Sequence, residues 1–204
     1  MRYIAGQFVD LYLPHQLCDA RGASRLFTLI STPREPLVGI AASFPVPSSS
    51  FKQALLALRP GDAASITGDA LGDFVLPKDP TVPLVWMAGG IGIASFVGMG
   101  KELAAESQPR RITFFHSIRR PEDALFGETW QAAGLAPQLS LTGTAAHWGD
   151  RRGRFLPDDL LHDANSSTLF YISGSDSMVE EVCAGLAAKG INREQLVREA
   201  YTGY

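Results

Sequence analysis

The sequence predicts two domains of different class: a small antiparallel β-barrel or sandwich, and after it an α/β domain built on a parallel sheet. Residues 1–79 contain short alternating strands divided by Gly-Asp turns, with a single helical stretch among them. Residues 80–204 instead alternate apolar strands with helices, which is typical of a parallel sheet covered on both faces. The proline-containing segment Lys78–Pro83 separates the two patterns, and we expect the domain boundary there.

Short apolar runs predict the strands of the first domain, over residues 7–13, 25–31, 38–44, 63–67 and 73–76. Prolines or Gly-Asp pairs stand between them and indicate turns. One helix interrupts these strands. It begins at Phe51, after serines that can cap it, and it ends before Pro60, with apolar residues at helical spacing between.

The second domain opens with a buried-type strand over residues 84–88, and further strands are predicted over 111–116, 138–142 and 168–173. Helices are predicted from the glycine run at Gly89 to about Glu106, over 124–133, and from 176 to 189. Asp176 is the expected N-cap of the last helix, and Gly190 is its expected C-terminal stop.

The composition is ordinary for a globular protein, with 46% hydrophobic and 19% charged residues. A net charge of −3 gives no indication of a nucleic-acid surface, and no apolar run reaches the roughly 20 residues that span a membrane. Cys18 and Cys183 are too few and too far apart for a zinc or iron–sulfur site, so no metal is expected. Free thiols and the absence of a signal-like N-terminus favour a cytoplasmic location.

The strongest local signal is the segment Gly89-Gly-Ile-Gly-Ile-Ala-Ser95, which follows a strand and opens a helix. Glycines let the backbone approach a pyrophosphate, and the helix N-terminus offers free N–H groups to its negative charge. The segment departs from the dinucleotide fingerprint, because Ser95 stands where a third glycine or alanine is usual. A tight strand-to-helix turn without a ligand is the alternative.

The end of the next strand carries Ser117-Ile-Arg119-Arg120 in place of the acidic residue that is typical of an NAD site. A hydroxyl and guanidinium groups suit a 2′-phosphate, because arginine offers a charged fork that matches phosphate oxygens. A solvated basic turn is the alternative.

Seven short motifs occur in order along nearly the whole chain: Arg25-Leu-Phe-Thr28, Ser48-Ser-Ser-Phe-Lys-Gln-Ala-Leu55, Pro60-Gly-Asp62, Gly72-Asp-Phe74, Ala88-Gly-Gly-Ile-Gly-Ile93, Tyr171-Ile-Ser-Gly174 and Glu199-Ala-Tyr-Thr-Gly-Tyr204. Each motif alone has low specificity, but their order and spacing are highly specific. Together they resemble the ferredoxin-NADP reductase superfamily, especially its stand-alone bacterial flavodoxin/ferredoxin-reductase-like members.

The resemblance implies a barrel that binds a flavin, FAD with FMN open, and a second domain that binds NADP(H) with NAD(H) open. It implies that Arg25 pairs with the flavin phosphate, that Phe27 packs on the cofactor and that the Thr28 hydroxyl lies near flavin N5. Glu199 is implied as a proton or hydrogen-bonding group and Tyr204 as cover of the flavin ring, with ordinary closure of the last strand as the alternative. The other cofactor-binding residues that it implies are Ser49, Ser50, Gly90, Gly92, Ile93, Ser117, Arg119, Gly174, Asp176 and Met178.

The implied activity is that of an NAD(P)H-dependent flavoprotein oxidoreductase that passes electrons through bound flavin to a separate acceptor such as ferredoxin or flavodoxin. One alternative is an NAD(P)H:flavin or quinone reductase that uses diffusible flavin. Another, of a different class, is a degenerate member that binds a nucleotide or a partner without turnover.

Three departures from the family pattern support these alternatives. Ala94-Ser95 replaces Thr-Pro, and Gly174-Ser175-Asp176 replaces Gly-Pro-Pro. Gly6-Gln7-Phe8 lies at the start of the sequence, whereas the family has an opening strand or two before it, so we expect a barrel that is short by about 20 or more residues and has an open edge. Dimerisation, a rearranged sheet or loss of tight flavin binding is expected from this edge, and a homo-oligomer would cover it.

Overall fold

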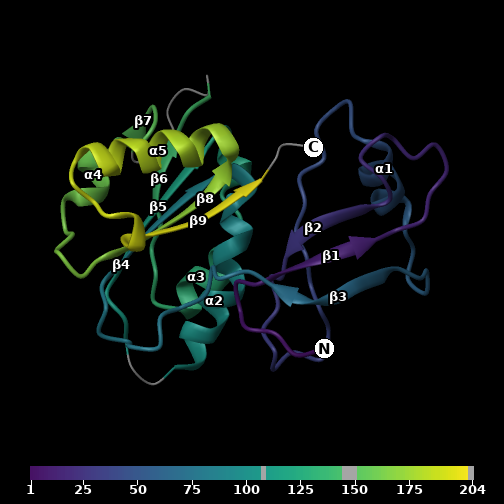
Figure 1. The fold of residues 1–204 in the computed structure, drawn as a ribbon, viewed down its shortest axis with the longest axis horizontal. Coiled ribbons are helices and arrows are strands. Elements are labelled where there is room, and N and C mark those ends of the chain that lie inside the picture. The colour runs from purple at the N-terminus through teal and green to yellow at the C-terminus, as the bar shows by residue number, and fades with distance from the viewer. Residues whose placement is uncertain (107–108, 144–150, 202–204) are drawn as a thin grey trace.

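A computed structural model of the chain describes residues 1–106, 109–143 and 151–201, which form two sheets side by side (Figure 1). An antiparallel sheet has the strand order β2-β1-β3, and a second sheet has the order β7-β6-β5-β4-β8-β9. Every pairing in the second sheet is parallel. The prediction of an antiparallel part followed by a parallel α/β part is confirmed.

The antiparallel sheet consists of β1 (Phe8–Tyr12), β2 (Ser24–Thr28) and β3 (Ser65–Leu71). Side chains alternate along a strand, so Leu11 of β1 and Phe27 of β2 share the buried face. They pack there against Phe51 of α1 (Ser50–Ala57). The predicted serine cap of this helix is confirmed, because Ser49 Oγ accepts from the Lys52 N–H at 3.3 Å.

The parallel sheet has β4 (Leu84–Gly89) near its centre. On one side lie β5 (Ile112–Ile118), β6 (Gln138–Leu141) and β7 (Arg151–Arg152), and on the other lie β8 (Leu169–Ser175) and β9 (Leu196–Tyr201). The connections include three short 3₁₀ helices, η1 (Gly90–Ile93), η2 (Pro121–Asp123) and η3 (Arg193–Gln195).

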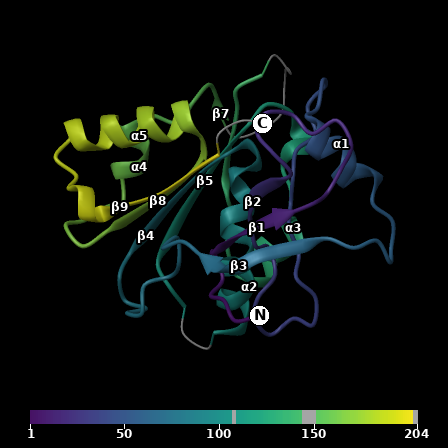
Figure 2. The ribbon, with the colours of Figure 1, turned by 45° about the vertical axis from the view of Figure 1, so that its right-hand side comes forward.

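Helices cover both faces of the parallel sheet (Figure 2). α2 (Ala94–Ala105) and α3 (Gly127–Ala132) pack on one face, and α4 (Pro157–Leu161) and α5 (Asp176–Ala188) pack on the other. The alternation of β4 explains this arrangement, because Trp86 enters the α2 core while Val85 and Met87 enter the α5 core. None of the described helices is both long enough and apolar enough to cross a bilayer.

The two sheets are joined mainly through α2 and β8. Gly98 of α2 lies so close to the antiparallel part that a Cβ there would stand 3.1 Å from the carbonyl oxygens of Leu29 and Ser31. The Tyr171 hydroxyl on β8 donates to the Val75 carbonyl at 2.6 Å. Lys101 of α2 forms an ion pair with Glu35 at 3.0 Å. The described residues therefore pack as one unit.

Several predicted elements differ from the structure. Residues 38–44 are not a strand, since their one bridge, Leu29↔Ile40, is isolated and no ladder continues from it among the described residues. Residues 73–76 are not a strand either. The Val75 carbonyl accepts a hydrogen bond from the Tyr171 hydroxyl, and the Phe74 side chain packs in the α2 core. The helix predicted over 124–133 is reduced to α3, because Phe126 adopts a left-handed φ of 64° just before it. Ser175 is the N-cap of α5, and Asp176, the predicted cap, is its first residue.

Candidate functional site

The carboxyl ends of β4 and β8 meet at the point where the order of the parallel strands reverses. Open α/β sheets bind ligands at this kind of edge. The turn after β4 approaches β8 so closely that a Cβ on Gly92 would stand 2.4 Å from the Ser173 carbonyl oxygen. Gly90 has a φ of +51°, which side chains with a Cβ rarely adopt. Gly92 is thus required because a side chain would collide with β8, and Gly90 is required because of its backbone conformation.

Five polar side chains meet between this edge and the end of β2. Thr28 ends β2, Ser95 lies in the first turn of α2, and Ser173 lies near the end of β8. Glu199 and Tyr201 project from β9 two residues apart and therefore to the same side. We call these five residues the hydroxyl–carboxylate cluster.

The hydrogen bonds of this cluster run in one direction. Thr28 Oγ1 donates to Glu199 Oε1, so it must accept from Tyr201 Oη, which lies 2.7 Å away. Tyr201 Oη in turn accepts from Ser95 Oγ at 2.8 Å, and Ser95 Oγ accepts from Ser173 Oγ at 2.8 Å. Each hydroxyl donates once, and the chain of donors ends on the carboxylate.

Glu199 is suited to hold a proton. Burial raises the pKa of its carboxyl above the ordinary value, against the hydrogen bond from Thr28 and the nearby hydroxyls of Tyr201 and Ser95, which lower it. Burial and the nearby Glu199 charge likewise raise the pKa of Tyr201. Glu199 Oε2 is buried and has no hydrogen-bond partner among the described residues. One carboxylate oxygen of the cluster is therefore left to a ligand or a proton.

Positive charge gathers at the N-terminus of α1. The Arg25 guanidinium lies 5.2 Å from the centre of the Phe51 ring, in the first turn of that helix. Burial lowers the pKa of Lys52, and the charges of Arg21 and Arg25 lower it further. Helix N-termini and clustered cations both favour a phosphate. The residues present therefore fit the phosphates of a flavin nucleotide.

The same residues already have protein partners. Arg25 Nη1 donates to the carbonyls of Arg21, Gly22 and Ser24 at 2.6–3.0 Å, and its Nη2 lies 3.2 Å from Asp19 Oδ1. A hydrogen bond from Arg21 lowers the pKa of Asp19 to about 2. The 19–24 loop thus holds the guanidinium in place in the structure.

The serines expected at the flavin phosphates are also engaged. Ser49 caps α1, and Ser50 Oγ lies 3.1 Å from His15 Nε2 and 3.3 Å from the Asp19 nitrogen. Phe27 is buried and stacks on Phe51, with ring centres 6.0 Å apart.

The residues expected at the adenosine 2′-phosphate lie at the carboxyl end of β5. Ser117 Oγ is 2.8 Å from Ser140 Oγ at the neighbouring end of β6. The Arg119 side chain is exposed and forms no ion pair with any described residue. Arg120 beside it pairs with Asp123 at 2.9 Å. Arg119 is therefore the arginine of this turn that is available to an anion.

The remaining expected residues lie near the carboxyl ends of the neighbouring strands β4 and β8. Gly174 packs against Gly89, and Met178 Sδ lies over both, 2.2 Å and 2.5 Å from where a Cβ on Gly89 or Gly174 would stand. Asp176 is exposed, whereas the Ile93 side chain is fully buried in the α2 core. Tyr204 lies outside the described residues.

Two members of the cluster, Tyr201 and Ser173, were not predicted from the sequence. The spacing of Tyr201 from Glu199 was the available signal, since side chains two apart on a strand share a side. Ser173 could not be predicted as a site residue, because the sequence of a buried strand does not show whether a serine only packs there or forms a hydrogen bond to a helix, as Ser173 does to Ser95. The sequence marked Ser95 only as a departure from the family pattern, but from the first turn of α2 its hydroxyl contacts Tyr201 and Ser173.

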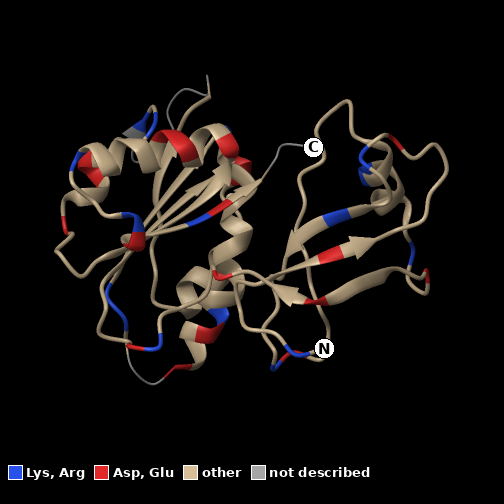
Figure 3. Ribbon diagram, in the orientation of Figure 1, with Lys and Arg blue, Asp and Glu red and all other residues tan. Residues whose placement is uncertain are grey.

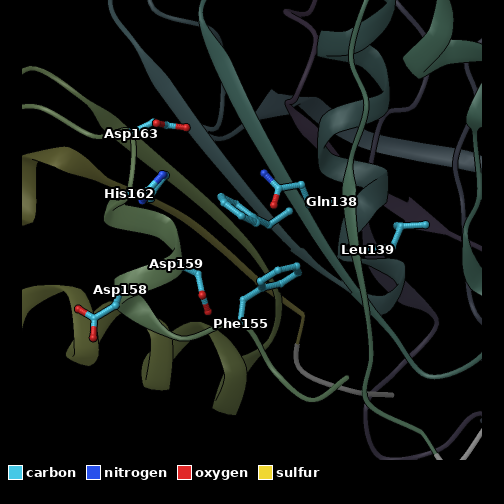
Figure 4. A pocket seen from close by; sticks show the side chains of 8 residues that line it. Gln138, Leu139, Phe155, Asp158, Asp159, His162 and Asp163 are labelled. Atoms are coloured by element: carbon cyan, nitrogen blue, oxygen red, sulfur yellow. The ribbon is translucent and has the colours of Figure 1, made fainter. Parts of the chain in front are cut away.

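A cavity of about 440 Å³ lies elsewhere, between α4 and the strands β5 and β6 (Figure 4). Asp158, Asp159 and Asp163 line it beside His162 and the aromatic pair of Phe115 and Phe155. Figure 3 shows further acidic residues along α5 on the same face of the sheet. Carboxylates repel phosphates, so this cavity is unsuited to a dinucleotide. Among the described residues, no three His, Cys, Asp or Glu side chains, those of this cavity included, are placed so that they could hold one metal ion.

Comparisons with known proteins agree with this arrangement. Residues 86–184 match the family described as the oxidoreductase NAD-binding domain. The reductase subunit of an aromatic O-demethylase from Amycolatopsis sp. is 28% identical over 99% of this chain, which spans 62% of that protein. A flavohemoglobin from Malassezia yamatoensis, with bound FAD and heme, has the same fold over 97% of this chain and 51% of its own, with a TM-score of 0.81 and 24% identity.

A ferredoxin NADP+ reductase from Neisseria gonorrhoeae, with bound FAD and NADP, is similar over 98% of this chain and 87% of its own. Its TM-score is 0.73 at 22% identity, a likeness of fold. The chain thus spans about half to two thirds of the first two proteins and most of the third.

Proposed function

Because the chain is a member of the ferredoxin-NADP reductase superfamily, we propose that it is an NAD(P)H-dependent flavoprotein oxidoreductase. The observation that carries the proposal is the hydroxyl–carboxylate cluster between β2 and the carboxyl ends of the parallel strands. A flavin bound there, FAD or else FMN, would supply the chemistry that accepts a hydride and releases electrons.

In this proposal the chain's own residues bind the flavin phosphates, orient a hydroxyl and hold a proton. Arg25, Lys52 and the N-terminus of α1 hold the flavin phosphates. The Thr28 hydroxyl is oriented by Glu199, whose carboxyl holds a proton more readily than an exposed one because burial raises its pKa. The turn at Gly90 and Gly92 admits the pyrophosphate of the nicotinamide nucleotide.

We propose that the electron acceptor is a separate protein of the ferredoxin or flavodoxin kind. The Amycolatopsis relative is a reductase subunit and the Neisseria protein a ferredoxin reductase, which supports this assignment. We also propose a domain boundary at residues 79–80, and a homo-oligomer that covers the outer edge of β3, which is exposed along its length. A monomeric mass in solution with full flavin occupancy would contradict the oligomer.

The visible spectrum of the purified protein tests the main proposal. Flavin absorption bands should be present, or appear on adding FAD, and they should bleach on adding NADPH. A colourless protein that does not take up FAD would reject the proposal.

The nucleotide preference tests Arg119. Arg119→Ala should raise the KM for NADPH about tenfold and leave the KM for NADH unchanged, because a charge-assisted hydrogen bond to the 2′-phosphate is lost. Arg120→Ala is the matched control. Because Arg120 is already paired with Asp123, this variant should change the preference for NADPH over NADH little. An unchanged preference in Arg119→Ala would reject Arg119 for this role.

One observation favours a second candidate, a reductase that treats flavin as a diffusible substrate. The 19–24 loop and Asp19 already hold the Arg25 guanidinium, so a flavin phosphate must compete with these contacts. Protein purified without flavin whose NADPH oxidation saturates with added free flavin would support this candidate. Flavin retained through gel filtration would exclude it.

A further inference from the structure

His116 lies directly beneath the glycine turn and has no role in the function proposed above. It belongs to β5, opposite Ala88 of β4, and is 1% exposed. Its Nε2 is 3.0 Å from the carbonyl oxygen of Gly90. A polar ring buried this deeply requires a partner, and the Gly90 carbonyl is that partner.

We propose that His116 is a positioning residue, which fixes the peptide between Gly90 and Ile91 so that the Ile91 N–H faces the pyrophosphate of the bound nicotinamide nucleotide. This inference rests on the proposed function, because it names how that site is held ready for its substrate.

The geometry of the peptide between Gly90 and Ile91 determines where its N–H points. In a trans peptide the carbonyl oxygen and the following N–H point in opposite directions. With the Gly90 oxygen held against β5, the Ile91 N–H is directed away from the sheet. A Cβ built on Gly90 meets no described atom within 4 Å, so the outer side of the turn is open to a ligand.

The protonation state agrees with a donor role. Burial lowers the pKa of His116, and the Gly90 carbonyl and the charge of Asp123 only partly oppose this effect. The imidazole is therefore neutral at physiological pH. Since a carbonyl can only accept, Nε2 carries the proton in this bond.

The test compares His116→Phe, which removes the donor, with His116→Gln, which retains one. Phe114→Leu is the matched control, because Phe114 lies on the same strand and face but packs in the α2 core away from the turn. Isothermal titration calorimetry measures the dissociation constants of NADP+ and of 2′-AMP, which lacks the pyrophosphate. Steady-state kinetics then separate the KM for NADPH from kcat.

His116→Phe should weaken NADP+ binding about tenfold, as expected for one misplaced hydrogen bond, and leave 2′-AMP binding within about twofold. His116→Gln should restore most of the NADP+ affinity, and Phe114→Leu should alter neither constant. The KM for NADPH should rise with little change in kcat. If His116→Phe does not fold, His116→Met takes its place with the same expectations.

Three results would overturn the inference: unchanged NADP+ affinity in the donor-less variant, equal loss of NADP+ and 2′-AMP binding, or no recovery with glutamine. Failure of the proposed function would give a different binding result, one seen in the wild-type protein itself. In that case the wild-type protein would bind neither NADP+ nor 2′-AMP.

Discussion

Replacing Gly92 by alanine should be the most damaging single-methyl change in the glycine turn. The new Cβ would stand 2.4 Å from the Ser173 oxygen, 2.6 Å from its carbonyl carbon and 2.8 Å from Gly174 Cα. All three are backbone atoms of β8, so no side chain can move aside. Relief needs a shift of about 1 Å between the turn and a central strand, and overpacking of this kind costs about 3 kcal/mol.

Two other glycines provide matched controls. Gly90→Ala meets no described atom within 4 Å, and it should cost about 1 kcal/mol for the left-handed conformation alone. Gly127→Ala, at the start of α3, has open space and an ordinary φ and should not destabilise the protein.

Thermal unfolding followed by circular dichroism measures the difference. In a chain of this size 1 kcal/mol lowers Tm by about 2–4 °C, so Gly92→Ala should unfold about 6–12 °C below the wild type. The reasoning is refuted if Gly92→Ala unfolds within about 2 °C of the wild type. It is also refuted if Gly90→Ala is the more damaging of the two.

Three further predictions concern single contacts. Tyr171→Phe should lower the free energy of unfolding by about 1 kcal/mol, because the half-buried Val75 carbonyl loses its donor; urea denaturation measures this, and no change would mean that water replaces the hydroxyl. Burial raises the folded-state pKa of Glu199 above 4.5, so the wild-type free energy of unfolding should fall as pH rises from about 4.5 through that raised pKa. Glu199→Gln should remove this fall and be the more stable protein at pH 8, and parallel pH profiles would contradict the assignment. Arg154→Ala should change stability by less than about 0.5 kcal/mol, because its ion pair with Glu181 is exposed, and a larger loss in urea denaturation would show a role beyond that pair.

The parallel part of the fold was predictable because its signals are local. Each strand from β4 to β8 that carries an apolar run was found, and Gly190, with a φ of +90°, ends the last helix as expected. α4 was missed although Pro157 and two aspartates mark its start, with Asp159 accepting from the Leu156 N–H. A five-residue helix has too few apolar repeats to show a period.

The antiparallel part was less predictable because strand identity depends on neighbours. Residues 38–44 have the composition of a strand, yet a ladder needs a partner on at least one side along its length. β3 shows the effect of pairing: the strand predicted over 63–67 is observed as Ser65–Leu71, which is mostly exposed, and β1 pairs with it as far as Leu71.

The site was predictable where the backbone itself makes it, as at Gly90 and Gly92. It was not predictable where side chains from distant segments bond to each other. The bond between Thr28 and Tyr201 depends on how β2 and β9 are placed by α2 and β8 between them. No local pattern encodes that distance.

The bond from Thr28 to Glu199 joins residues 171 positions apart. Ribosomes add about 5–20 residues per second, so roughly 10–30 s separate the synthesis of the two partners. During that interval β2, α1 and most of the parallel sheet are available to fold, but the carboxylate that completes the site does not yet exist. The cations near α1 are therefore synthesised long before this carboxylate, and a cofactor captured early would meet them first.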